Sequence, residues 1–471
     1  MLFVKLMPTK RKIYFRSDAG PEIGYGHYIR SLALADMLKQ DFDCTMFTQA
    51  PTDYQLREAK EVCPVVSLPN DDSKFDEFLD YLHGDEIVVL DNYFFTTDYQ
   101  RAIKTKGCKL VCIDDMHDKH YVADIVINHG CDDPSLFDKE DYTRLCLGFD
   151  YALLRRPFLE NQTNVERQKG FVVVCFGGSD PHDLTRKYAE RLIISQGVEH
   201  IIAVVGDGYQ YRDALSNIPN VEIRSRLSAS EMANLFRSAE TVVCSASTTA
   251  YEALACGAKV YAGWYADNQM DLYQHLCASK AIVPLGHLTG SNLAFYKQVE
   301  TAIVNLRTSK YNLRKALWQL ALIEKNYTEL TEEESKQVWQ TRNLPHIRQW
   351  MFNSNPFSWE EHAQFVTNLA QRTDKLYMAF FDGEQLVASY DLIDIHDGQT
   401  ECGLYLHPYY EGKGVASMIE ERMEEIASVK GIRIITSQVL MNNAVSVVFY
   451  ERNGFYKTSE ENGVIHFLKK I

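Results

Sequence analysis

His27 lies in a stretch, Arg16–Arg30, whose residue types and spacing could carry acid–base chemistry. An imidazole can take a proton from water near neutral pH, which makes histidine a common general base. Gly24 and Gly26 precede an apolar-periodic segment, Ile29–Leu38, that predicts a helix, and glycines there let the backbone approach a ligand closely. Because open α/β sheets bind ligands beyond the carboxyl ends of their strands, we expect His27 to face a crevice.

Carboxylates follow several strand-like runs near His27. Asp18 could orient the imidazole or contact a substrate, and it could equally cap its own loop. Asp91–Tyr93 comes directly after another apolar run and should also face the crevice. A metal cluster is an alternative for a later group of acidic and histidine residues, but they lack a helical His-x₃-His spacing, so we expect no metal. That group is Asp114, Asp115, His117 and His120.

Polar turns follow two later strand-like runs and could hold part of a nucleotide. The turn Gly177–Ser179 ends the buried run Phe171–Phe176, and its backbone N–H groups could bind phosphate oxygens. The run Lys259–Trp264 ends in a polar loop that contains Asn268 and Gln269. Turns of this kind are common after strands, so neither one alone indicates a nucleotide site. Their occurrence in the same region of the chain is what favours one.

A strand-to-helix corner, Ser245–Gly257, combines small and hydroxyl residues with the start of a helix. Thr248 and Thr249 stand where a helix N-terminus would favour a diphosphate. The Glu252 carboxylate, a few residues on, could accept hydrogen bonds from ribose hydroxyls. An N-cap that serves only the helix is the alternative role of this corner.

A third glycine-containing loop, Glu411–Ala416, follows the strand-like run Glu401–Leu406 and precedes a helix expected over Ser417–Val429. Its backbone N–H groups could bind a pyrophosphate, although the carboxylate of Glu411 would not favour one. Tyr450 lies on a later helix, Ala444–Arg452, where packing alone is the alternative role.

The elements around these residues indicate an α/β chain that ends in an α+β domain. Up to about residue 330, strand-like runs alternate with helical segments, which predicts parallel sheets built from βαβ units. After residue 340, three strands are followed by a helix, a strand and a helix. We expect domains at 10–160, 161–330 and 340–471, and a helix over Leu313–Glu324 between the last two. The expected strands are Lys12–Phe15, Cys44–Thr48, Val65–Leu68, Glu86–Asp91, Lys109–Ile113, Ile125–Ile127, Phe171–Phe176, Ile201–Gly206, Thr241–Cys244, Lys259–Trp264, Leu376–Phe381, Gln385–Leu392, Glu401–Leu406 and Ile432–Val439.

The composition limits the classes of binding partner and indicates the cellular compartment. The 471 residues are 46% hydrophobic and carry a net charge of −15, which argues against binding to nucleic acid or an anionic membrane. No uninterrupted apolar run of about 18 residues occurs, and the N-terminus lacks the order of a signal peptide, so we expect a cytoplasmic protein without a membrane span. Eleven scattered cysteines without a Cys-x₂-Cys pair favour buried, reduced thiols.

Five ordered motifs resemble the UDP-sugar hydrolases of bacterial pseudaminic acid biosynthesis, over residues 12–325. They are Arg-x-Asp-Ala…Ile-Gly-x-Gly-His-x-x-Arg, Tyr151–Arg155, Phe176–Asp180, Thr249–Glu252 and Asn268–Gln269. That family removes UDP from UDP-2,4-diacetamido-2,4,6-trideoxy-β-L-altropyranose without a metal, on two Rossmann-like domains of the GT-B type. The resemblance implies that His27 is the catalytic histidine. Ser245–Ser247 departs from the family, which has a Gly-Gly before Ser/Thr there. The motifs and the resemblance together assign the substrate and UDP site to Asp18, Gly24, Gly26, Arg30, Gly177, Gly178, Ser179, Thr248, Thr249, Glu252, Asn268 and Gln269.

The loop Glu411–Ala416 resembles the acetyl-CoA pyrophosphate loop of the GNAT acetyltransferases, Gln/Arg-x-x-Gly-x-Gly/Ala, with Glu411 as a departure. The resemblance implies that Asn443 contacts the cofactor arm and that Tyr450 protonates the leaving thiolate. Residues 342–365 further resemble the amino-sugar N-acetyltransferases of the same pathway, which act on a 4-amino UDP-sugar. The residues assigned to acetyl-CoA, as co-substrate, are Gly412, Lys413, Gly414, Val415, Ala416 and Asn443.

The sequence therefore predicts two Rossmann-like domains followed by a GNAT domain, in an enzyme that acetylates a 4-amino UDP-sugar and then releases UDP by hydrolysis. One alternative is a GT-B glycosyltransferase in which His27 is the base toward an acceptor hydroxyl. A second alternative is a degenerate GNAT domain that senses acetyl-CoA without transfer, which Glu411 favours.

Overall fold

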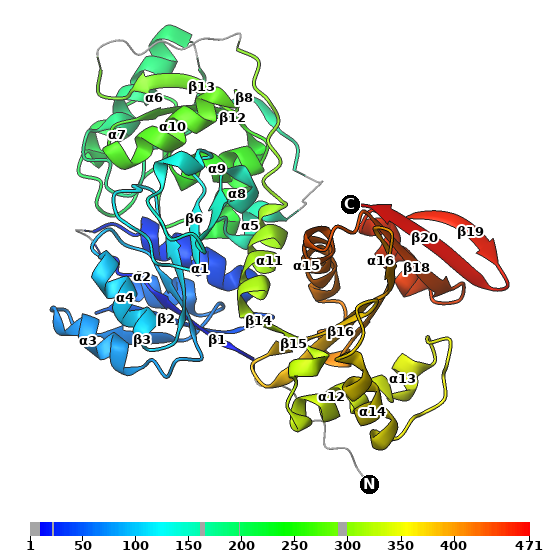
Figure 1. Ribbon diagram of the computed structural model, residues 1–471. Helices are drawn as coiled ribbons and strands as arrows, with labels where there is room; N and C mark the ends of the chain where they lie inside the picture. Colours follow the sequence, from blue (N-terminus) through cyan, green and yellow to red (C-terminus); the bar gives the residue numbers. More distant parts are fainter. Residues whose placement is uncertain (1–9, 21–22, 161–164, 197, 291–298) are drawn as a thin grey trace. The chain divides into compact units, whose positions relative to one another are not determined.

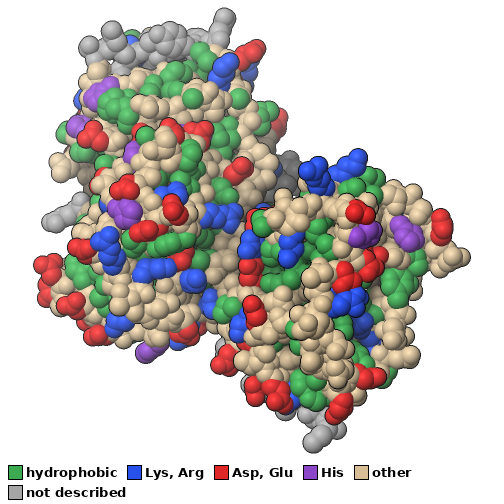
Figure 2. Space-filling view, in the orientation of Figure 1, with side chains coloured by type: hydrophobic (Ala, Val, Ile, Leu, Met, Phe, Trp, Pro, Cys, Tyr) green, Lys and Arg blue, Asp and Glu red, His purple; other side chains and the backbone are tan. Residues whose placement is uncertain are grey.

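The computed structural model describes residues 10–20, 23–160, 165–196, 198–290 and 299–471. The chain divides into two compact units, Lys12–Arg314 and Lys315–Ile471, the latter joined by Arg11, whose guanidinium donates to the Ala321 carbonyl (2.9 Å). The first unit holds two parallel sheets and the second holds one mixed sheet, so the predicted fold class is confirmed (Figure 1). In Figure 2, Lys and Arg side chains are interspersed with Asp and Glu over the visible face. Among the described helices, none has the length and apolar character needed to cross a membrane.

The first sheet has seven parallel strands in the order β3-β2-β1-β4-β5-β6-β7. Its inner strands are continuous apolar runs such as the buried Ile87–Leu90, which is typical of parallel sheets. The strand order reverses between β1 and β4, so residues that follow these two strands meet at a topological switch point. The strands are β1 (Lys12–Arg16), β2 (Asp43–Gln49), β3 (Val65–Leu68), β4 (Ile87–Leu90), β5 (Lys109–Ile113), β6 (Ile125–Asn128) and β7 (Arg144–Leu147). The helices are α1 (Gly26–Leu38), α2 (Asp53–Ala59), α3 (Ser73–Asp80), α4 (Thr97–Thr105) and α5 (Arg156–Leu159).

The second sheet has six parallel strands in the order β10-β9-β8-β11-β12-β13, with its switch point between β8 and β11. The strands are β8 (Gln168–Cys175), β9 (His200–Val204), β10 (Val221–Arg224), β11 (Ala239–Ser245), β12 (Lys259–Trp264) and β13 (Val283–His287). The helices are α6 (Leu184–Gln196), α7 (Arg212–Ser216), α8 (Ala229–Ser238), α9 (Thr248–Ala255) and α10 (Met270–Ala278). The turn Gly177–Ser179, which follows β8, and the strand-to-helix corner Ser245–Gly257, which follows β11, thus both lie at this second switch point.

Helix α11 (Ser309–Ala321) begins against the first sheet's domain. Arg314 forms an ion pair with Asp41 (2.7 Å), and the Asn312 side chain donates to the Asp150 carbonyl (3.0 Å). The prediction that this helix continues to Glu324 is wrong. It ends at Ala321 because Leu322–Asn326 pairs with the next domain's sheet as the edge strand β14.

The third sheet is mixed, in the order β14-β15-β16-β17-β18-β20-β19. β17 and β18 are parallel and pair over only three residues each, Gln399–Glu401 and Ile434–Thr436, and then separate. The hairpin of β19 and β20 was not expected from the sequence. The strands are β15 (Leu376–Asp382), β16 (Gln385–His396), β17 (Gln399–Leu406), β18 (Ile434–Leu440), β19 (Tyr456–Glu461) and β20 (Val464–Lys470). The helices are α12 (Glu332–Arg342), α13 (Pro345–Arg348), α14 (Trp359–Leu369), α15 (Val415–Val429) and α16 (Ala444–Arg452).

Candidate functional site

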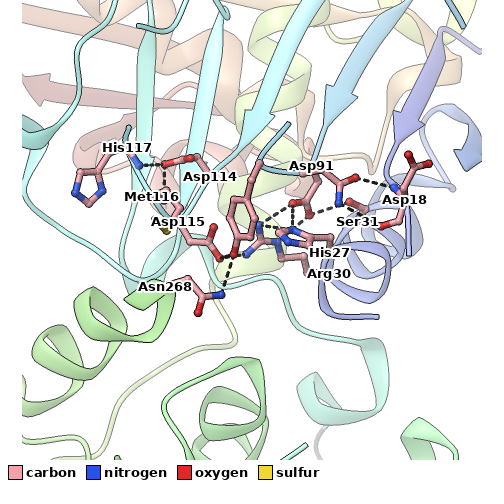
Figure 3. Close-up of polar contacts among 12 residues, drawn as sticks. Asp18, His27, Arg30, Ser31, Asp91, Asp114, Asp115, Met116, His117 and Asn268 are labelled. Carbon is pink, nitrogen blue, oxygen red and sulfur yellow. Dashed lines mark hydrogen bonds and ion pairs between the residues drawn. The ribbon is translucent and has the colours of Figure 1, made fainter. Parts of the chain in front are cut away.

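His27 forms a dyad with Asp91 at the switch point of the first sheet (Figure 3). His27 is the second residue of α1, which follows β1, and Asp91 directly follows the neighbouring strand β4. The imidazole Nδ1 lies 2.8 Å from Asp91 Oδ1. Arg30 Nη2, which can only donate, also lies 3.1 Å from Nδ1, but the contact with the Asp91 carboxylate is the shorter one. We therefore assign the proton to Nδ1, which leaves Nε2 with the lone pair that a general base needs. The dyad can therefore take a proton from water.

Asp91 is fully buried and is held by three further donors. Arg30 donates from Nε to Oδ2 (2.8 Å) and from Nη2 to Oδ1 (2.6 Å), and the Ser31 hydroxyl donates to Oδ2 (3.0 Å). Burial by itself would raise the pKa of Asp91, but Arg30 and His27 outweigh it and hold that pKa below its ordinary value. The carboxylate is thus ionised and fixed, which orients the imidazole.

Asp18, which the sequence offered as a partner of the imidazole, lies in a different network. Both of its oxygens contact the Arg16 guanidinium, its Oδ2 lies 3.0 Å from Lys74 Nζ, and its Oδ1 accepts from the Gln49 N–H (2.8 Å). The suggestion that Asp18 orients His27 is therefore wrong, because Asp91 occupies that position. The sequence placed Asp91 at a strand end but could not tell which strand lies beside β1.

Tyr93 and Asn268 link the dyad to the second sheet's domain. The Tyr93 ring packs edge-on against His27 at 4.6 Å, and the Asn268 amide donates to the Tyr93 hydroxyl (2.8 Å). Asn268 belongs to the 3₁₀ turn Asp267–Gln269 after β12, where Gln269 Oε1 accepts from the Tyr265 N–H (3.0 Å). The structure thus brings His27 and Asn268, which are far apart in the sequence, to one site.

Glu252, expected to accept hydrogen bonds from ribose, is held by an arginine of the first domain. Arg155 contacts Glu252 Oε1 through Nε and Nη2, both at 2.8 Å. Burial raises the pKa of Glu252, and Arg155 offsets part of that shift. Nearby, the Tyr251 hydroxyl donates to the His129 carbonyl, so the start of α9 contacts both domains of this unit.

The N-terminus of α9 has backbone N–H groups that could bind an anion. Its first turn contains Thr248 and Thr249, carries no acidic residue, and receives no cap from a side chain in the described chain. The Ser247 hydroxyl, which would be the cap, donates instead to the Ser245 carbonyl (3.4 Å). A purely structural N-cap, the alternative from the sequence, is therefore not what this corner forms.

The turn after β8 differs from that arrangement. Asp180 caps α6, accepting from the N–H groups of Leu184 (2.9 Å) and Thr185 (2.7 Å). The exposed turn Gly177–Ser179, rather than the helix end, is therefore the surface that a phosphate could reach.

Gly206 packs closely against the backbone of this turn at Gly178. A Cβ on Gly206 would lie 2.5 Å from the Gly178 carbonyl oxygen and 2.7 Å from its Cα, so backbone would have to move. We expect Gly206→Ala to lower the free energy of unfolding by about 1–3 kcal/mol and to weaken UDP binding. Denaturant unfolding and calorimetric titration with UDP measure both, with Gly208→Ala as control because its Cβ would make ordinary contacts. Wild-type stability of Gly206→Ala would contradict the role of this contact.

The residues considered as an alternative metal cluster are separated by their own partners. Asp114 Oδ2 accepts from the N–H groups of Met116 (3.1 Å) and His117 (2.7 Å), while His120 bonds to Asp138 (2.9 Å). Within the described ranges, no three His, Cys, Asp or Glu side chains are grouped to hold a metal ion.

In the third sheet's domain, the glycine loop leads directly into α15. Gly412 and Gly414 have positive φ (73° and 78°), which only glycine adopts without strain, and Gly414 is the N-cap. The first turn of α15 includes Val415 and Ala416, has no acidic residue, and lacks a side-chain cap among the described residues. Its N–H groups can therefore bind a pyrophosphate. The Lys413 ammonium lies over the Tyr409 ring, 3.5 Å from its centre.

Tyr450 lies where β17 and β18 separate. Beyond Glu401 and Thr436 the two strands no longer pair, which leaves backbone groups available to an extended, amide-containing chain. The Ser437 hydroxyl donates to the Cys402 carbonyl (3.2 Å) across the start of this gap, and the Tyr450 hydroxyl lies 3.9 Å from Cys402 Sγ. Tyr450 is 5% exposed, and burial raises its pKa, so it remains protonated.

Asn443 caps the helix that carries Tyr450. Its side-chain oxygen accepts from the Ser446 N–H (3.2 Å) at the start of α16. The Asn443 side-chain oxygen is thus bonded within the helix cap, and its side-chain NH₂ group is the part that could donate to a cofactor.

Residues 344–455 match the model of the acetyltransferase (GNAT) family. Acetyltransferase PseH of Campylobacter jejuni is 30% identical over 146 residues, which cover 31% of this chain and 92% of that protein. The UDP-2,4-diacetamido-2,4,6-trideoxy-beta-L-altropyranose hydrolase of C. jejuni is 25% identical over 272 residues, 55% of this chain and 93% of that protein. An uncharacterized protein of Methanocaldococcus jannaschii, MJ1062, is 23% identical over 482 aligned positions, 95% of this chain and 97% of that protein.

The chain therefore carries an acetyl-CoA-dependent acetyltransferase domain, and its first unit has a distant similarity to a UDP-sugar hydrolase. Through the mixed-sheet domain with the Gly412–Gly414 loop, the chain belongs to the acetyltransferase (GNAT) family.

Proposed function

We propose that the protein performs two consecutive reactions on a UDP-activated amino sugar. The mixed-sheet domain transfers an acetyl group from acetyl-CoA to the 4-amino group. The first unit then hydrolyses the glycosyl–UDP bond of the resulting 2,4-diacetamido-2,4,6-trideoxyhexose, in nonulosonic acid biosynthesis. The observation that carries the proposal is that one chain is similar to an acetyltransferase and to a UDP-sugar hydrolase, each over more than nine tenths of that protein.

For hydrolysis, the dyad supplies the base. His27 Nε2 removes a proton from water, the water oxygen bonds to the anomeric carbon, and the carbon–oxygen bond to UDP breaks. The imidazolium that forms is stabilised by the ionised Asp91, 2.8 Å from Nδ1. The reaction requires no metal in this scheme.

The departing diphosphate is negative, and the second domain offers donors to it. The uncapped first turn of α9, with Thr248 and Thr249, and the exposed turn Gly177–Ser179 both follow strands at the second switch point. Donors aimed at charge that develops on the leaving group lower the barrier more than donors to the bound substrate.

For acetyl transfer, the gap between β17 and β18 receives the extended arm of acetyl-CoA, and the α15 N-terminus receives its pyrophosphate. Tyr450 then donates its hydroxyl proton to the departing thiolate. This supports catalysis over mere sensing of acetyl-CoA.

Incubation of the protein with the diacetamido UDP-sugar alone tests the hydrolase. We expect UDP and free sugar in equal amounts without an added acceptor. UDP release that requires an added acceptor hydroxyl would instead establish the glycosyltransferase alternative.

Tyr450→Phe is expected to lower kcat for acetyl transfer by about 10²-fold or more, because the thiolate loses its proton donor. The dissociation constant for acetyl-CoA should stay close to wild type, since the ring packing against Phe467 and Phe455 is preserved. Steady-state kinetics and calorimetry measure the two. An unchanged kcat would exclude Tyr450 as the acid, and Tyr456→Phe, an exposed tyrosine of β19, is the matched control.

A further inference from the structure

We propose that Asp391 binds the ammonium group of the amino acceptor and takes its proton, on the face of the third sheet opposite Tyr450. The inference rests on the proposed acetyl transfer and names the subsite that would bind the primary amine of the acceptor. Neither the sequence motifs nor the similarity to acetyltransferases pointed to this residue.

The Asp391 carboxylate lies directly over the strand that leaves the parallel pair. Asp391 on β16 is opposite Gly403 on β17, two residues beyond Glu401, where pairing with β18 ends. A Cβ on Gly403 would lie 3.0 Å from Asp391 Oδ1 and 3.2 Å from Oδ2. A side chain at position 403 would therefore push the carboxylate away from β17 by a few tenths of an ångström.

The proposed acid and base lie on opposite faces of the same gap. Consecutive residues of a strand point to opposite faces, so Gly403 and Cys402 present opposite faces of β17. Cys402 contacts Tyr450 of α16. Gly403, and with it Asp391, shares the other face with Tyr405, whose hydroxyl donates to the Val338 carbonyl of α12. An amine from the Asp391 side and a proton from the Tyr450 side would thus reach a thioester in the gap from its two sides.

The Asp391 carboxyl group has no hydrogen-bond donor among the described residues, although Arg342 at the end of α12 lies near enough to act on its charge. Burial raises the pKa of Asp391 to about 7, with Arg342 opposing that shift. A carboxyl with such a pKa can exchange a proton near neutral pH. The other ionisable groups that act on its charge are Lys375, Tyr377, Glu401, Tyr405 and Tyr327, together with the Cys402 thiol on the opposite face.

The substrate ammonium gives one proton to the Asp391 carboxylate, and the neutral amine attacks the thioester carbonyl carbon. A carbon–nitrogen bond forms, and the nitrogen, which then carries a positive charge, loses a second proton to solvent. The carbon–sulfur bond breaks, and Tyr450 gives its proton to the thiolate. Asp391 then releases its proton to solvent and the Tyr450 oxygen takes one up, so the products are the acetamido sugar, CoA and one released proton.

Three variants test the assignment with the 4-amino UDP-sugar as substrate, in the full chain. Asp391→Asn keeps the shape and should lower kcat/KM for the amine by about 10²–10⁴-fold, with an unchanged dissociation constant for acetyl-CoA. Gly403→Ala should lower it by about 10–10²-fold, since the new Cβ displaces the carboxylate. Asp394→Asn, an exposed residue of the same strand, is the matched control. The wild type should also lose kcat/KM below a pH near 7, and this limb should disappear in Asp391→Asn.

The outcomes separate this inference from the proposed function. Wild-type transfer with normal kcat/KM and an unchanged pH limb in Asp391→Asn would overturn the role of Asp391 and leave acetyl transfer standing. No transfer to the 4-amino UDP-sugar by the wild type would overturn both. Loss in Asp391→Asn and Gly403→Ala, with wild-type rates in Asp394→Asn and unchanged thermal unfolding, would support the assignment.

Discussion

Replacing His27 with alanine is expected to slow UDP release from the diacetamido UDP-sugar by about 10²–10⁴-fold. In the proposed mechanism the imidazole Nε2 accepts the proton from water. Asp91 cannot take over this role, because it is already bonded to Arg30, Ser31 and His27 Nδ1. Acetyl transfer, which uses residues of the other unit, should remain at its wild-type rate. Chromatography of released UDP and a thiol assay for CoA measure the two reactions on the same preparation.

His120→Ala is the matched control for this substitution. His120 is another histidine of the same domain that bonds to a carboxylate, Asp138, at 2.9 Å. We expect its replacement to leave UDP release unchanged. Equal losses in His27→Ala and His120→Ala would contradict a specific catalytic role for His27.

Asp91→Asn is expected to affect both activity and stability. Asparagine cannot stabilise the imidazolium, so UDP release should fall by about 10²–10⁴-fold. The buried Arg30 would also lose a charged partner while it keeps Asp115 (2.8 Å), so the free energy of unfolding should fall by about 3 kcal/mol. Denaturant unfolding at neutral pH measures the second effect, and Asp115→Asn, at the more exposed end of the same guanidinium, should cost less.

The stability effect has a defined pH dependence. The pKa of Asp91 is lower in the folded protein than its ordinary value near 3.9, so its contribution is present above that value and is lost as the pH falls below it. The difference in unfolding free energy between wild type and Asp91→Asn should therefore shrink as the pH falls below about 4. A difference that grows in acid would contradict the ionised state assigned to Asp91.

Much of the fold could be predicted because apolar runs with turn residues define parallel strands. Lys109–Ile113 and Lys259–Trp264 have the predicted bounds. The hairpin of β19 and β20 has a local sequence signal, because Asn462-Gly463 between the two strands is a favoured two-residue turn. Strand β14 has no such local signal, because Leu322–Asn326 continues the helical pattern that precedes it. Its pairing with β15 is what makes it a strand.

The place of His27 at a strand-to-helix turn was predictable from its spacing, whereas its partner depended on strand order. Asp91 and Asp18 both follow apolar strands, and only the adjacency of β1 and β4 decides that Asp91 meets His27. The Asp391 subsite depends likewise on register, since Gly403 lies opposite Asp391 in a pairing that no local pattern encodes. Sequence periodicity gives the elements, and long-range pairing gives the sites.

The most direct test of two consecutive reactions is mass spectrometry of the products formed from the 4-amino UDP-sugar in ¹⁸O-labelled water. With acetyl-CoA, the wild type should yield CoA, UDP and free diacetamido sugar that carries one ¹⁸O, while His27→Ala should stop at the acetylated UDP-sugar. Tyr450→Phe should leave most of the amino substrate unreacted. Accumulation of the acetylated UDP-sugar by the wild type, with no free sugar, would contradict the hydrolytic step and with it the central claim.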